Sequence, residues 1–116
     1  MTDSQSPEAA LFGRARGAII AELFAHSNSE LHGREIARRR KVSAQSIAEE
    51  LAKMQDLGIV TSRAVGNLHL YSANTRFALY HELRAIAAKI WGAEWQLKEL
   101  LSSVSGIDVV AIFGSY

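Results

Sequence analysis

The sequence predicts a mainly α-helical protein with one small β-hairpin and a long C-terminal helix. Three observations support this fold class. Apolar residues recur at helical spacing up to residue 57, two β-prone runs flank Gly66-Asn67, and an apolar heptad seam runs from Leu79 to Val104. A chain of 116 residues holds one domain, or one domain with an extension.

The first two helices are expected at residues 11–25 and 32–40. Apolar side chains recur every three or four residues in the first segment, and the polar stretch Ser27-Asn28-Ser29 ends it. In the second segment Ile36 faces inward and the arginines face outward. Residues 1–10 are polar and are expected to form a flexible N-terminal extension.

The third helix is expected at residues 43–57. The Ser43 hydroxyl can accept a hydrogen bond from the first free amides, as an N-cap does, and Gly58 suits the position just after a helix. One buried stripe is predicted, formed by Ile47, Leu51 and Met54.

A β-hairpin is expected to follow, with Gly66-Asn67 as its two-residue loop. A glycine in the first loop position suits a type II′ turn. This loop would pair Val65 with Leu68 and Arg63 with Leu70.

The segment 75–105 is expected to be one long helix that serves as a linker and dimerisation element. Its apolar seam is Leu79, Leu83, Ile86, Ile90, Ala93, Leu97, Leu100 and Val104. So long a seam predicts a homodimer, because so much apolar surface is unusual in a monomer. The predicted interface consists of Leu79, Leu83, Ile86, Ile90, Trp91, Trp95, Leu97 and Leu100. The alternative is that the helix folds back on its own domain, against the first helix.

Composition restricts the function classes. The formal net charge is only +1, and cysteine is absent, so disulfides and thiolate metal sites are excluded. No signal peptide and no membrane-spanning run is recognised, and a cytoplasmic protein without membrane partners is expected. The four histidines lack the spacing of metal ligands, so neither metal nor cofactor is predicted.

Basic charge is concentrated in the middle of the chain. Residues 30–76 contain eight Lys or Arg and five Asp or Glu, a net charge of +3, whereas the remainder has a net charge of −2. Such a concentration is typical of a nucleic-acid footprint, although arginines at a helix C-terminus also complement the helix dipole.

The order helix, short helix, tight turn, helix and hairpin predicts a winged helix-turn-helix over residues 11–74, in which the helix 43–57 enters the major groove of double-stranded DNA. Gln45 and Ser46 lie in its first turn, where base edges are met, and Lys53 suits a phosphate. Glu49 could accept from a cytosine amino group, but a solvated surface residue is the favoured interpretation. The predicted DNA-binding residues are Arg38, Arg39, Arg40, Lys41, Ser43, Gln45, Ser46, Lys53, Arg63, Asn67 and His69.

The stretch LHGREIARRRKVSAQSIAEELAKMQDLGIVTSRAVGNLHLYSAN resembles the winged-helix domain of small bacterial and archaeal transcriptional regulators of the ArsR/MarR type. The resemblance covers residues 11–74. It implies sequence-specific DNA binding, usually as a dimer.

The final residues, VVAIFGSY, resemble the start of the catalytic motif of polymerase-β-like nucleotidyltransferases. Gly114 and Ser115 match the motif as a nucleotide-binding remnant, and residues 106–116 would be the first strand and Gly-Ser stump of such a domain. The metal-binding acid pair of that family does not follow, so no enzymatic activity is expected of this chain. The alternative function is the N-terminal part of an antitoxin-like or nucleotide-transferring protein. An ordinary edge strand that ends in a glycine turn is the remaining interpretation.

Overall fold

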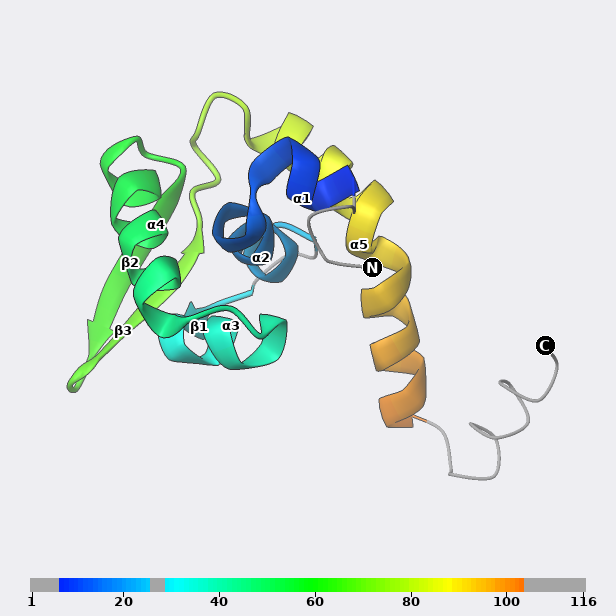
Figure 1. Cartoon of the computed structure of the whole chain (residues 1–116). Coiled ribbons are helices and arrows are strands. Elements are labelled where there is room, and N and C mark those ends of the chain that lie inside the picture. Colours follow the sequence, from blue (N-terminus) through cyan, green and yellow to red (C-terminus); the bar gives the residue numbers. More distant parts are fainter. Residues whose placement is uncertain (1–6, 26–28, 104–116) are drawn as a thin grey trace, which may run out of the picture.

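The computed structural model describes residues 7–25 and 29–103 and contains five helices and a small sheet in these ranges (Figure 1). Their order along the chain is α1 (Pro7–Phe12), α2 (Arg14–Leu23), β1 (Leu31–His32), α3 (Gly33–Arg40), α4 (Ala44–Asp56), β2 (Val60–Val65), β3 (Leu68–Ala73) and α5 (Tyr80–Ser103). This is the predicted mainly helical, winged helix-turn-helix architecture. In Figure 1, α4 and the hairpin lie at one end of the molecule and α5 lies at the other, with α2 between them.

The sheet has three antiparallel strands in the order β1-β3-β2. The predicted hairpin register is confirmed, since Val65 pairs with Leu68 and Arg63 pairs with Leu70. Gly66 has φ 62° whereas Asn67 does not have a positive φ, which fits a type II′ turn and not a type I′ turn. The short strand β1 was not predicted; its two residues extend the sheet by pairing Leu31 with Tyr71.

The N-terminal region differs from the prediction in two ways. Instead of one helix over 11–25, two helices meet at Gly13, whose φ of 80° is left-handed and interrupts the helical backbone. In addition, α1 begins at Pro7, within the ten residues expected to be flexible; proline at the first helical position is favourable because its missing N–H has no partner there.

The helix-turn-helix has the predicted ends. Ser43 caps α4, because its Oγ accepts from the Ser46 N–H at 3.1 Å. Gly58 follows the C-cap of α4 with φ 76°. These two ends fix where α4 starts and stops relative to α3 and the hairpin.

The core lies between α2, α3, α4 and the first residue of β2. Its largest buried apolar side chains come from these four elements and, for Phe24, from the C-cap of α2: Ile19, Leu23, Phe24, Ile36, Ile47, Leu51, Met54 and Val60. The predicted stripe of α4 is therefore confirmed as its buried face. The helix α5 closes the core from the other side through Ala87 and Trp91, and the Trp91 ring lies 6.5 Å from the ring of Phe12 in α1.

The long helix begins at Tyr80, later than the expected Thr75. An Asx turn precedes it, in which Asn74 Oδ1 accepts from the Arg76 N–H at 3.0 Å. None of the helices in the described part of the chain is long and apolar enough to cross a membrane. The predicted terminal strand, together with Gly114 and Ser115, lies outside the described residues.

Candidate nucleic-acid interface

A tight turn sets α3 against α4. Lys41 adopts a left-handed conformation with φ 56°, and the Val42 N–H donates to the carbonyl of Ala37 at 3.1 Å, which ends α3. Ser43 then starts α4. The turn buries Ile36 of α3 and Ile47 of α4 in one core and leaves the opposite face of α4 uncovered by the described chain.

The uncovered face of α4 displays the predicted polar residues. Gln45, Ser46, Glu49 and Lys53 are all exposed. The Gln45 amide donates to Glu49 Oε2 at 3.3 Å, and the Ser43 hydroxyl donates to Ser46 Oγ at 2.8 Å. The first turn thus offers an amide and two hydroxyls, groups that can meet base edges in a major groove.

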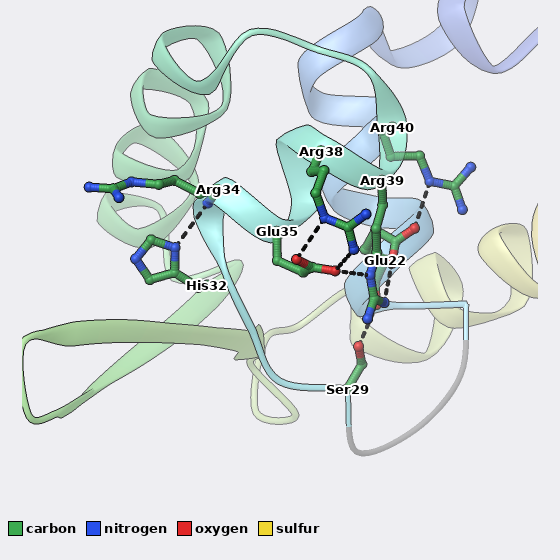
Figure 2. Close-up of polar contacts among 8 residues, drawn as sticks. All are labelled: Glu22, Ser29, His32, Arg34, Glu35, Arg38, Arg39 and Arg40. Carbon is green, nitrogen blue, oxygen red and sulfur yellow. Dashed lines mark hydrogen bonds and ion pairs between the residues drawn. The ribbon is translucent and has the colours of Figure 1, made fainter.

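The basic run at the end of α3 is extensively paired with carboxylates (Figure 2). Glu35 accepts from Arg38 and, at 2.8 Å, from Arg39 Nε. These hydrogen bonds, the one from Arg38 first, lower the pKa of Glu35 from its ordinary value of 4.5 to about 2. Arg38 and Arg39, two of the predicted DNA-binding residues, therefore have an acidic partner on their own helix.

The second acid that neutralises this run is Glu22 of α2, and it is fully buried. Its Oε1 accepts from Arg39 Nη1 at 3.1 Å and its Oε2 accepts from Arg40 Nε at 2.7 Å, as Figure 2 shows. Both carboxylate oxygens are thus paired, as a buried charge requires. Sequence reasoning missed this ion-pair network, although a lone glutamate within the apolar run of α2 was a signal for it.

On the wing, which we define as β2, β3 and the turn between them, Arg63 also has an acidic partner. Its Nε and Nη2 donate to the two oxygens of Glu30, at 2.5 and 2.9 Å. The Arg63 guanidinium lowers the pKa of Glu30 through these bonds. Asn67 at the turn and His69 on β3 are exposed, as predicted for a wing.

A cavity of about 380 Å³ lies between the start of α3, the uncovered face of α4 and the wing. His32, Arg34, Gln45 and His69 are among its lining residues. Sequence reasoning missed His32 and Arg34 as members of this surface, because only the folded sheet brings β3 beside the start of α3. Among the described residues, no group of three or more potential metal ligands is present.

The helix α5 has an inward and an outward side. Trp91, predicted at a dimer interface, is only 5% exposed and belongs to the core of its own chain. The predicted residues Leu83 and Ile90 are partly buried against that core, so the alternative of a helix folded back on its domain holds for this side. Four other predicted interface residues are exposed, namely Leu79, Ile86, Leu97 and Leu100. The side chain of Trp95 lies outside what the structure describes.

Comparison with solved structures relates the chain to transcription regulators. The predicted DNA-binding transcriptional regulator from E. coli shares 25% sequence identity with it at a TM-score of 0.50, over 73% of this chain and 86% of that one. MepR, a transcription regulator of the Staphylococcus aureus multidrug efflux pump MepA, shares 15% identity at a TM-score of 0.53, over 87% of this chain and 72% of that one. No protein-family model and no curated protein matches the chain. These likenesses support the winged helix-turn-helix fold.

Proposed function

We propose that this chain is a transcriptional regulator that binds double-stranded DNA sequence-specifically, with α4 in the major groove and the wing beside it. The observation that supports this most is the uncovered face of α4. Its first turn presents Gln45 and Ser46 to solvent on a helix whose other face is locked into the core. A helix held in this way fits the major groove, where every base pair has its own pattern of donors and acceptors.

The residues divide into two roles. Gln45 and Ser46 read base edges, and Gln45 can exchange its bond to Glu49 for a bidentate pair with adenine. Lys41 and Lys53 contact phosphates, because they are exposed and no carboxylate lies within ion-pair distance of either lysine in the described ranges.

The arginines have a different part in this proposal. Arg39 and Arg40 anchor α3 to α2 through Glu22 and contribute to DNA binding chiefly by holding the helix-turn-helix together. Arg38 is 72% exposed at its side chain and can add a phosphate contact, as can Arg63 once it leaves Glu30.

The similarity to the predicted DNA-binding regulator from E. coli also supports the proposal, since it extends over most of both chains. The proposal assigns this chain a binding role and invokes no catalytic residue.

We further propose that the active form is a homodimer that pairs the outward side of α5. At about 100° per residue, Ile86 and Leu97 lie roughly 90° around α5 from buried Ala87, on a side that the described residues leave open. In a two-fold dimer this side would bring two α5 helices together and carry two α4 helices to successive turns of a DNA duplex.

The test is binding to DNA at physiological salt. A duplex selected from a random pool and a scrambled duplex of the same length are titrated with the protein by fluorescence anisotropy. The proposal predicts preference for the selected duplex, and Gln45→Ala should reduce that preference by about 1–3 kcal/mol at one base pair. Lys53→Ala, the matched phosphate variant, should weaken both complexes equally. Equal affinity of the wild-type protein for the two duplexes would contradict sequence-specific binding.

A further inference from the structure

The cavity between α3, α4 and the wing has the chemistry of an anion site. Arg34 lines it, is exposed, and has no carboxylate within ion-pair distance in the part of the chain that the structure describes. This distinguishes Arg34 from its neighbours Arg38 and Arg39 on the same helix, which are both bound to Glu35. In Figure 2, the side chain of Arg34 points away from these carboxylates, on the side of α3 where His32 lies.

Two imidazoles add donors to the same cavity. The Nδ1 of His32 accepts from the Arg34 N–H at 3.1 Å, so the neutral ring carries its proton on Nε2 and can donate it. His69 reaches the cavity from β3, where it pairs with Ala64 in the register. Among the described residues that line the cavity there is no Asp or Glu, so no carboxylate among them repels an anion.

The other wall of the cavity is apolar. It is formed by Ala44 and Ala48 of α4 together with Leu51. Gly33 lies close to this wall, since a Cβ at that position would meet Leu51 Cδ1 at 3.2 Å, a tight contact. A ligand that suits this cavity has an anionic group and a compact, largely apolar group next to it.

We propose that this cavity seats one phosphodiester of the DNA backbone, with Arg34 as its main ligand, and we call it the phosphate seat. The phosphate would bond the Arg34 guanidinium and the imidazole N–H groups, and the adjoining deoxyribose would lie on Ala48 and Leu51. Since Gln45 lines the same cavity, a backbone held there places base edges at the first turn of α4. This inference rests on the proposed function and assigns the contact that fixes the register of α4 on the duplex.

Variants of the full chain test the phosphate seat first. Arg34→Gln should weaken binding to selected and scrambled duplexes alike, by about tenfold, and should reduce the salt slope of the affinity by about one. Arg34→Lys should restore the slope, because it keeps the charge. Arg76→Gln, an exposed arginine after β3, is the matched control and should change the affinity less than twofold. Equal losses in Arg34→Gln and Arg76→Gln would overturn the proposal, since any surface charge would then have the same effect.

A scan with neutral methylphosphonates locates the phosphate. Each phosphate of the selected duplex is replaced in turn, and binding of the wild-type protein and of Arg34→Gln is measured. We expect one position in each half-site where the replacement weakens wild-type binding about tenfold but leaves the Arg34→Gln complex nearly unchanged. Additive losses at every position would show that no phosphate meets Arg34 and would overturn the phosphate seat.

A second experiment tests whether the ligand of the cavity is a phosphodiester of the DNA backbone or a free phosphate compound. Inorganic phosphate is titrated into the protein while the amide signals of residues 32–34 and 69 are followed by NMR. Chemical-shift changes that require millimolar phosphate agree with a site built for a phosphodiester. Saturation at micromolar phosphate, with DNA affinity unaffected by Arg34→Gln, would overturn the backbone assignment. A wild-type chain that binds no duplex would refute the proposed function instead, and the phosphate titration would still show whether the cavity binds the anion.

Discussion

Replacing the buried carboxylate of Glu22 with an amide of the same size should destabilise the protein strongly. Glu22→Gln keeps the size of the side chain and one acceptor oxygen but removes the charge that Arg39 and Arg40 share. Breaking one partner of a buried ion pair typically costs about 3–5 kcal/mol. Here the Arg39 and Arg40 side chains remain 33% and 18% exposed and regain some water, so we expect a loss of about 2–3 kcal/mol.

Urea unfolding followed by far-UV circular dichroism measures this loss at a fixed protein concentration. The expected change corresponds to a fall in Tm of roughly 8–15 °C for a domain of this size. Glu49→Gln, which alters an exposed carboxylate of α4, is the matched control and should stay within about 0.5 kcal/mol. In a double-mutant cycle, Glu22→Gln and Arg40→Gln should couple by about 1–2 kcal/mol. A loss below about 0.5 kcal/mol in Glu22→Gln, or additivity in the cycle, would refute the network as an anchor of α3.

Three further predictions concern pH, the wing and the dimer. The folded-state pKa of Glu35, about 2, lies below its ordinary value of 4.5, so its ion pairs stabilise the fold above about pH 4.5 and this contribution is lost as the pH falls to about 2. The free energies of unfolding of wild type and Glu35→Gln should therefore converge between pH 4.5 and pH 2. A difference that stays constant over this range would contradict the pairing. Glu30→Gln should free Arg63 for phosphate and tighten binding to any duplex several-fold at low salt, whereas weaker binding in an anisotropy titration would argue against release of Arg63. Ile86→Asp, on the outward side of α5, should give a folded monomer in sedimentation at micromolar concentration. A wild-type chain that is also monomeric at this concentration would contradict the proposed dimer.

The sequence predicts well those features that depend on neighbouring residues. The Ser43 cap needs an amide three residues away, and the loop Gly66-Asn67 defines the register of the hairpin by its own length. The buried stripe of α4 follows from helical spacing in the same way. Such features are local, so the pattern of residue types is enough to reveal them.

Features that depend on tertiary contacts were not predictable in this way. Glu22 meets Arg39 and Arg40 from 17 and 18 positions away in the chain, so a count of charges within residues 30–76 overestimated the free basic surface. The strand β1 has only two residues, too few for any alternation, and exists because β3 lies beside it. The exposed first turn of α4 could be predicted from the sequence, whereas the proposed role of Arg34 depends on the wing that packs beside it.

The most direct test of DNA recognition by α4 and the wing is an NMR map of the protein surface that DNA contacts. Amide signals of the labelled chain are followed as a selected duplex is added, with a scrambled duplex as the reference. The largest changes that are specific to the selected duplex should fall on the first turn of α4, from Ala44 to Ala48, with further changes at residues 32–34 and on the wing from Arg63 to His69. Changes concentrated on α1 or α5, with the amides of α4 unmoved, would contradict the account.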